Sequence, residues 1–223
     1  MKRLAHSVWP EISGDHILVI PVGSTEQHGP HLPFSTDTDV AVALALALGT
    51  VRDDLVLAPA VPYGSSGEHQ GFPGTLSIGP DATELVLVEL GRSASETFSR
   101  ILFVSGHGGN AIPVNRAVRR LRSEGRDVLA WAPRWKGDAH AGRTETSLLL
   151  STHPESVRLD RAEPGNTAAL AELLPVLREQ GLRPVTANGV LGDPTGADAE
   201  EGARLFAEAT GDLATTVSRW LGE

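Results

Sequence analysis

The sequence of 223 residues has no cysteine, a single methionine and only 4% aromatic side chains. The lack of cysteine excludes disulfides, thiolate metal ligands and a thiol nucleophile. Basic residues are also scarce: 19 Lys and Arg against 28 Asp and Glu give a net charge of −9, which argues against nucleic acid as a partner. No apolar run is long enough to cross a bilayer, and no signal-peptide pattern follows the start. We therefore expect a cytoplasmic protein without a membrane partner.

The composition that remains is that of an ordinary globular protein, with 40% hydrophobic and 21% charged residues. Short β-branched runs alternate with helical patterns along the chain, which predicts an α/β fold with a mostly parallel sheet and helices on both faces. No linker or repeat divides the chain, so we expect one domain over residues 1–223. The predicted strands are Ile17–Pro21, Leu55–Ala58, Ile101–Ser105 and Val128–Ala132. The predicted helices are Val40–Leu48 after a cap at Thr38, one from Pro80 or Asp81 through Leu90, Ala111–Glu124, a short one capped by Thr144, Ala168–Glu179 and Glu200–Leu221.

Hard oxygen and imidazole donors gather in three loop-like places, each after a predicted strand. The first is Glu26-Gln27-His28 with Asp37 downstream, the second is the stretch 106–110 around His107, and the third is the stretch 140–145. In open parallel sheets, ligands bind beyond the carboxyl ends of the strands. The three loops should therefore converge on one site.

Carboxylate and imidazole ligands are typical of hydrolytic Zn, Mn or Fe(II) centres, where the metal acidifies a water and polarises a carbonyl. Glu26 and His28 are two residues apart, so an extended backbone turns both to one side. Asp37 is placed to bridge two ions, and Glu145 is a natural further ligand. The alternative is structural: solvated loop residues, with Asp37 as a helix cap and Glu145 stabilising a helix N-terminus.

His140 is the candidate proton shuttle, taking a proton from the attacking water and delivering it to the leaving amine. Two further places carry weaker signals for substrate binding. Glu68 and His69 either line a pocket or form a polar surface turn, and Asn110 either fixes its loop or donates to an oxyanion. The glycines of 106–109 also resemble a dinucleotide loop, but the acid that fold requires, Asp127, stands at the wrong end of the next strand.

Four ordered motifs together resemble the creatininase (creatinine amidohydrolase) family. They are residues 21–33 with 36–39, residues 68–69 with 72–75, residues 106–110, and residues 140–142 with 145–147. The resemblance implies a three-layer α/β/α fold, a binuclear metal site that cleaves amide or lactam bonds, and a homo-oligomer.

Matching positions also imply residue roles: Glu26 and His107 would bind one ion and His28 the other. Asp37 would bridge the two ions, and His140 would carry the proton. Creatininase proper has a glutamate ligand where this chain has Gly109. Glu145 matches the acid that other branches of the family use instead, so this departure argues against creatinine as the substrate.

The stretches 137–147 and 188–197 resemble a peptidase branch of that family, which acts in the maturation of mycofactocin, a ribosomally made redox cofactor. This resemblance implies release of a modified C-terminal Val-Tyr part from a precursor peptide, by a metal-bridging hydroxide that attacks the amide carbonyl. Arg143 would then clamp a substrate carboxylate or pair at the surface, and the loop 188–197 would close over the peptide. Two alternatives stay open: an enzyme that opens or deformylates a small cyclic amide, and a metal-containing scaffold without catalysis.

Overall fold

The computed structural model describes residues 1–223 and contains one five-stranded parallel sheet. Its strands lie in the order β1-β3-β2-β4-β5. This confirms the predicted parallel sheet. The added strand, β1, is only two residues long, too short to leave a pattern in the sequence. The strands are β1 (Lys2–Arg3), β2 (Ile17–Val22), β3 (Leu55–Leu57), β4 (Arg100–Ser105) and β5 (Asp127–Trp131).

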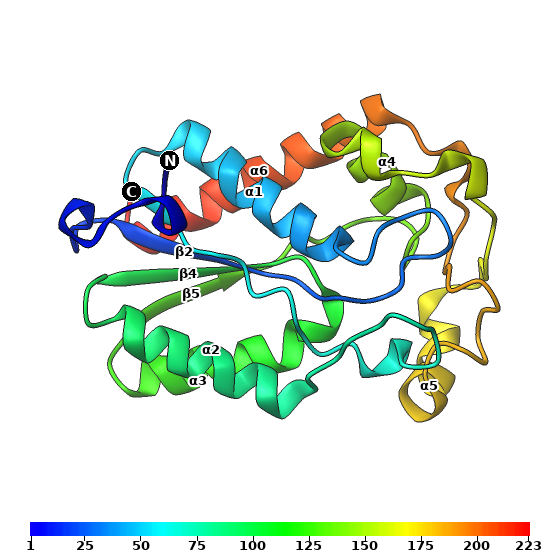
Figure 1. Cartoon of the computed structure of the whole chain (residues 1–223), viewed down its shortest axis with the longest axis horizontal. Coiled ribbons are helices and arrows are strands. Elements are labelled where there is room, and N and C mark those ends of the chain that lie inside the picture. The colour runs from blue at the N-terminus through cyan, green and yellow to red at the C-terminus, as the bar shows by residue number, and fades with distance from the viewer.

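Helices cover both faces of the sheet, which confirms the three-layer arrangement (Figure 1). Alternate side chains of β2 enter separate cores, as the two-residue period of a strand requires. Ile17 and Val19 pack in the core beneath α1 and α6, whereas Leu18 and Ile20 pack in the core beneath α2 and α3. The helices are α1 (Thr36–Val51), α2 (Pro80–Ala94), α3 (Ala111–Ser123), α4 (Arg143–Thr152), α5 (Leu170–Gln180) and α6 (Ala199–Leu221).

Two predicted helix caps are wrong, and one of them matters for the site. Helix α1 begins at Thr36, so Thr38 lies inside its first turn and its hydroxyl donates to the carbonyl oxygen of Ser24. Asp37 is therefore held by a helix and not by the end of a loop. Helix α4 begins at Arg143, and the hydroxyl of Thr144 donates to Asp138 at 3.3 Å. In both cases the hydroxyl donates to a residue of an earlier loop and does not cap its own helix.

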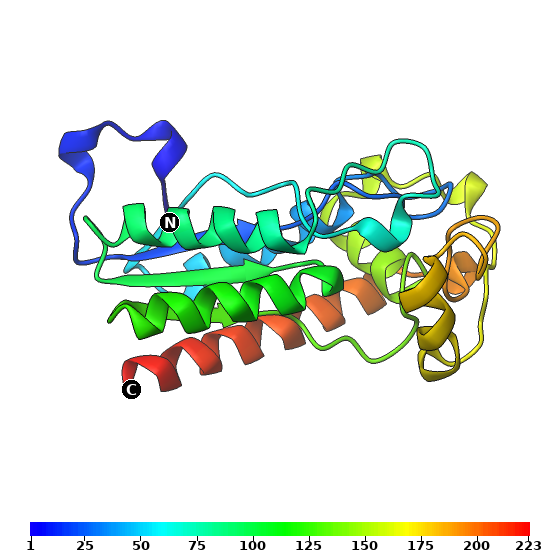
Figure 2. The same ribbon diagram turned by 90° about the horizontal axis from the view of Figure 1, so that it is seen from below.

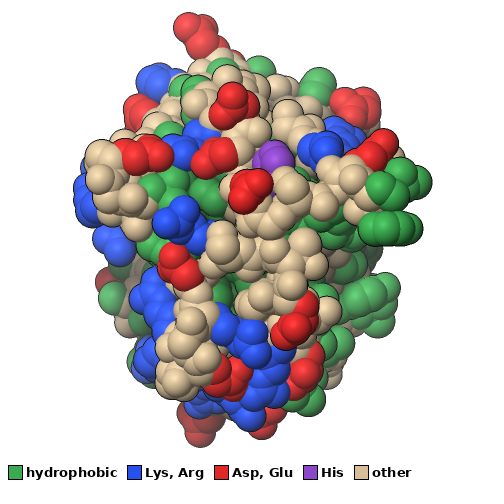
Figure 3. All heavy atoms as spheres, turned by 90° about the vertical axis from the view of Figure 1, so that its left-hand side faces the viewer, with side chains coloured by type: hydrophobic (Ala, Val, Ile, Leu, Met, Phe, Trp, Pro, Cys, Tyr) green, Lys and Arg blue, Asp and Glu red, His purple; other side chains and the backbone are tan.

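The two edges of the sheet differ in character. The amino-terminal edge shows charged side chains of both signs at its surface (Figure 3). The carboxyl edge carries the longer loops, and α5 stands there, beyond the end of the sheet (Figures 1 and 2). None of the helices is long and apolar enough to cross a membrane.

Candidate metal centre

The structure brings the three donor clusters together at the carboxyl edge of the sheet. Glu26 and His28 follow β2, His107 follows β4, and His140 follows β5. These four side chains and Asp37 are buried, and Glu145 on α4 is partly buried. Their donor atoms form three overlapping groups, each with all atoms within 4.8 Å of one another. The groups are Glu26 with His28 and His140, Glu26 with Asp37 and His107, and His28 with Asp37 and Glu145.

Asp37 occupies the middle of this cluster. Its Oδ1 lies 3.3 Å from His28 Nε2, and its Oδ2 lies 3.1 Å from His107 Nδ1. On the far side, His107 Nε2 lies 3.2 Å from Glu26 Oε2. The hydroxyl of Ser24 donates to Asp37 Oδ2 at 2.5 Å and fixes the carboxylate. One carboxylate oxygen thus faces each of two histidines, which is the placement expected of a group that bridges two cations.

Each of three histidines contacts a backbone carbonyl with one ring nitrogen. His28 Nδ1 lies 3.2 Å from the carbonyl of Glu26, His107 Nε2 lies 2.9 Å from that of Ser65, and His140 Nε2 lies 2.8 Å from that of Gln27. A carbonyl oxygen only accepts, so each of these nitrogens carries the proton. The other nitrogen of each ring is left to face the cluster, and this is how metal-ligating histidines are usually oriented.

Two buried atoms of the cluster have no hydrogen-bond partner, Glu26 Oε2 and His28 Nε2. A buried polar atom without a partner destabilises a fold by about 1–3 kcal/mol. Both atoms are strong ligands for a divalent cation, and both belong to the overlapping donor groups. The residues present therefore fit a metal ion, because the ion would satisfy two buried donors that have charged neighbours at 3.2 and 3.3 Å but no hydrogen bond.

The charges in the cluster are strongly coupled. Burial raises the pKa of Asp37, but the charges of His28 and His107 outweigh burial and hold that pKa well below its ordinary value. Burial lowers the pKa of His28, yet Asp37 and the neighbouring carboxylates raise it to about 10. The pKa of His107 is likewise raised to about 10 by Glu26 and Asp37, against the effect of burial. This anionic environment stabilises positive charge, and a divalent cation competes with the imidazole proton for the same lone pair.

The pKa values of Glu26 and Glu145 are shifted mainly by burial. Burial raises the pKa of Glu26 to about 7, although His107 lowers it in part. Burial also raises the pKa of Glu145, whose Oε2 accepts the backbone N–H of Ala141 at 2.5 Å. Ala141 has a φ of +52°, a left-handed conformation that costs energy for a non-glycine residue. This turn directs His140 into the cluster.

Gln27 completes the site, and the sequence reasoning gave it no role. Its side-chain Oε1 accepts from the N–H of Gly29 at 2.8 Å, which fixes the orientation of the amide. Its Nε2 lies 3.0 Å from the carbonyl oxygen of Gly189, 3.0 Å from His69 Nδ1 and 3.1 Å from His140 Nε2. His140 Nε2 already carries a proton, so the two amide hydrogens go to Gly189 and His69. The sequence did contain a signal for Gln27: it lies between Glu26 and His28, and in an extended chain its side chain points away from theirs.

This assignment sets the protons of two histidines. His69 accepts at Nδ1 and carries its proton on Nε2, which lies 3.4 Å from Glu26 Oε1. His140 keeps Nδ1 free, 3.8 Å from the same oxygen. Burial lowers the pKa of His140 well below its ordinary value, with a further contribution from His28. Burial lowers the pKa of His69 to about 3. Both rings are therefore neutral, and His140 Nδ1 is a proton acceptor.

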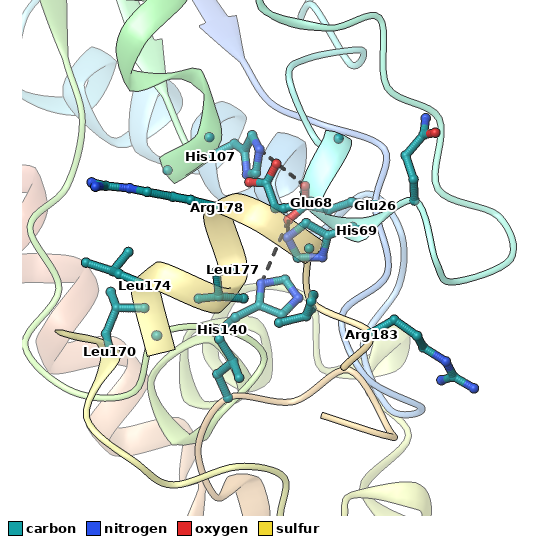
Figure 4. A pocket seen from close by; sticks show the side chains of 18 of the residues that line it. Glu26, Glu68, His69, His107, His140, Leu170, Leu174, Leu177, Arg178 and Arg183 are labelled. Atoms are coloured by element: carbon teal, nitrogen blue, oxygen red, sulfur yellow. Dashed lines mark ion pairs between the residues drawn. The ribbon is translucent and has the colours of Figure 1, made fainter. Parts of the chain in front are cut away.

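A cavity of about 910 Å³ opens onto the cluster. Glu68 and His69 line it, as the pocket interpretation predicted, together with members of the metal cluster (Figure 4). The far wall is formed by α5 and the start of α3, which the sequence did not indicate. Leu191, from the predicted closing loop, also lines the cavity and pairs with His140 through two backbone hydrogen bonds of 2.9 and 3.3 Å.

Two other candidates for substrate binding lie outside the cavity lining. The side chain of Asn110 is buried and accepts from the N–H of Ser65 at 2.9 Å while donating to the carbonyl of Gly23 at 2.8 Å. These bonds fix two loops of the site. The guanidinium of Arg143 is half-exposed and pairs with Glu201 at 2.6 Å. In this structure the guanidinium forms a surface ion pair, and a role for Arg143 as a clamp on substrate stays a prediction.

His31 is the third residue with an unpartnered buried atom, its Nδ1. Its Nε2 lies 2.8 Å from the hydroxyl of Thr146 on α4. Burial lowers the pKa of His31 to about 4, with His28 adding to the effect, so the ring is neutral. His31 therefore supports α4 from behind the cluster.

The similarities to known proteins agree with this geometry. A family model described as "Creatininase: Creatinine amidohydrolase" matches residues 5–217. The chain is 52% identical over 226 residues to the mycofactocin precursor peptide peptidase of Mycolicibacterium smegmatis, covering 98% of this chain and 89% of that protein. It is 50% identical over 215 residues to the peptidase of the same name from Mycobacterium tuberculosis H37Rv, covering 92% and 85%.

Solved structures give the same result. The crystal structure of a putative creatinine amidohydrolase from Bacteroides fragilis is 27% identical, with a TM-score of 0.79, covering 98% of this chain and 96% of that one. A creatininase variant is 25% identical, with a TM-score of 0.81, covering 97% and 98%. The chain therefore belongs to the creatininase (creatinine amidohydrolase) family of hydrolases.

Proposed function

We propose that this hydrolase is a metal-dependent peptidase that releases the modified C-terminal Val-Tyr part of the mycofactocin precursor peptide. The observation that carries the metal dependence is the buried cluster with two unpartnered donor atoms. The choice of substrate is supported by the relatives at 50–52% identity, which are named for that peptide.

Glu26 and His107 would hold one divalent ion and His28 and Glu145 the other, with Asp37 between them. Such ions acidify a water and polarise the carbonyl under attack. Carboxylate and imidazole donors suit Zn, Mn and Fe(II). Manganese and zinc forms of creatininase occur among the matching structures, at 24% identity and TM-scores of 0.82 and 0.80.

His140 is the proton carrier of this proposal. Its Nδ1 is unprotonated, faces the cluster and is held in place by the bond from Nε2 to the Gln27 carbonyl. It takes a proton from the attacking water and delivers it to the leaving amine. His69, protonated on Nε2, keeps Glu26 in place by hydrogen bonding.

Gly109 favours this reaction over the opening of a creatinine-like ring. A Cβ at this position would lie 2.8 Å from the Glu68 carboxylate and closer still to the His107 ring and the Ser65 carbonyl. The glutamate ligand of creatininase proper thus has no room here. The cavity also lies toward the upper end of the roughly 300–1,000 Å³ typical of small-molecule sites, which suits a peptide better than a small ring.

The test is mass spectrometry of the metal-loaded protein incubated with the enzymatically modified precursor peptide. We expect release of the two-residue product, its loss with a chelator, and its loss in His140→Gln. His6→Gln is the matched control, because His6 is exposed and remote from the cluster. Binding without cleavage would support a scaffold, and faster turnover of a small cyclic amide would support that alternative. Light scattering on the same preparation tests the predicted homo-oligomer.

A further inference from the structure

Helix α5 has an apolar stripe that does not pack on the sheet. None of its residues is buried. Leu170, Leu174 and Leu177 recur at helical spacing and all line the cavity. An amphipathic helix normally turns such a stripe toward the core. Here the stripe faces the cavity, which His140 also lines (Figure 4).

The helix is attached at its C-terminal end to the loop that carries Glu68 and His69. The N–H of Leu182 donates to the carbonyl of Glu68 at 2.7 Å, and Leu182 is buried. The guanidinium of Arg183 lies over the Phe72 ring, 4.8 Å from its centroid. These contacts hold the leucines at a fixed place relative to the cluster, although none of the residues of the helix is buried.

The start of α3 adds an apolar side chain to the same cavity. Ile112, in the first turn of α3, lines the cavity and is 64% exposed. An isoleucine and three leucines therefore flank a passage that ends at the buried ligands. Apolar side chains from two helices that line one cavity favour an apolar occupant, since burial of apolar surface is the dominant gain on binding.

We propose that the α5 stripe, together with Ile112 of α3, binds the apolar, aromatic C-terminal part of the substrate peptide that the enzyme releases. This rests on the proposed function, which brings a Val-Tyr part to the metal cluster. Val and Tyr expose a branched aliphatic group and a ring, and the stripe offers leucine side chains in the cavity that His140, the proton carrier for the leaving amine, also lines. The stripe thus determines specificity for a bulky apolar leaving group.

The test compares steady-state cleavage of the modified precursor by the metal-loaded wild type and three variants. Leu174→Asp should raise KM at least tenfold with metal content unchanged, and Leu174→Met should stay near wild type. Val176→Asp is the matched control, because Val176 lies on the same helix, is 37% exposed and does not line the cavity. Val-Tyr amide serves as a competitive probe, and its inhibition constant should rise in Leu174→Asp only.

Equal KM values for Leu174→Asp and wild type would overturn the inference while leaving the proposed function intact. So would an equal rise of KM in both aspartate variants. A change of oligomer mass in Leu174→Asp with unchanged KM would place a second copy on the stripe and would also overturn it. Wild type that cleaves no modified precursor would instead refute the proposed function.

Discussion

Metal binding should raise the free energy of unfolding, because two buried donor atoms of the cluster have no hydrogen-bond partner. Glu26 Oε2 and His28 Nε2 make no hydrogen bond, which costs at most about 2–6 kcal/mol, and the ion pairs with His107 and Asp37 offset part of that cost. A ligand at about 1,000 times its Kd stabilises the native state by about 4 kcal/mol, which is within that range. For a chain of this size, about 2–4 °C per kcal/mol converts this to a rise in Tm of about 8–16 °C.

The perturbation is Asp37→Asn, which preserves shape but removes the charge that faces both His28 and His107. Differential scanning calorimetry is run with Zn or Mn and again with excess chelator. We expect the full rise in Tm for wild type and most of it to be lost in Asp37→Asn. Asp39→Asn is the control, since Asp39 lies two residues further along α1 and its carboxylate accepts only the Ser35 hydroxyl, at 2.6 Å.

The absence of cysteine makes this measurement cleaner, because the unfolded chain has no thiolates to hold zinc. An equal rise in Tm for wild type and Asp37→Asn would show that metal binds elsewhere. No rise in wild type at saturating metal would show that the orphaned donors are not ligands. Either result would refute the assignment of these residues as metal ligands.

Three further predictions concern pH, packing and a surface charge. His28 and His107 have pKa values of about 10 against 6.5 when unfolded, so their protonation stabilises the metal-free protein below pH 6.5 and this stability is lost toward pH 10. Raising the pH from 7 to 9 therefore removes stabilisation from the metal-free protein, so the gap in Tm between metal-loaded and chelated protein should widen over that range. A constant gap would contradict this coupling. Gly109→Ala should displace His107, because a Cβ there would clash with its ring. The variant should therefore bind less metal, as measured by elemental analysis, and should be less active. Unchanged metal content and activity would show that the loop can move to make room for the methyl group. Arg143→Ala should cost less than about 1 kcal/mol and leave KM unchanged, because the ion pair with Glu201 is at the surface; a tenfold rise in KM would support the clamp instead.

The sequence was sufficient for the parallel sheet and for the meeting of the donors. Buried apolar runs such as Ile101–Ser105 are local features, and parallel strands place the residues that follow them at one edge. Glu26, His28, His107 and His140 therefore had to come close together once the strands were recognised. Their assignment as ligands and proton carrier remains a prediction for the experiments above.

Other features were decided by tertiary contacts. Thr38 and Thr144 looked like caps, but Ser24 and Asp138 take their hydroxyls. The proton positions on His69 depend on Gln27, 42 residues away in the sequence. No local pattern encodes such a pairing, because hydrogen bonds are chosen by whichever partners the folded chain brings within reach.

Helix α5 combines a feature that the sequence determines with one that tertiary contacts determine. The sequence by itself determined that residues near 170–180 form a helix with apolar positions at helical spacing. Only the tertiary structure decided that this face lines the cavity and does not pack on the sheet, because its attachment to the Glu68 loop holds it beyond the end of the strands. Periodicity fixes which side chains share a face, whereas the contacts at the ends of the helix fix what that face meets.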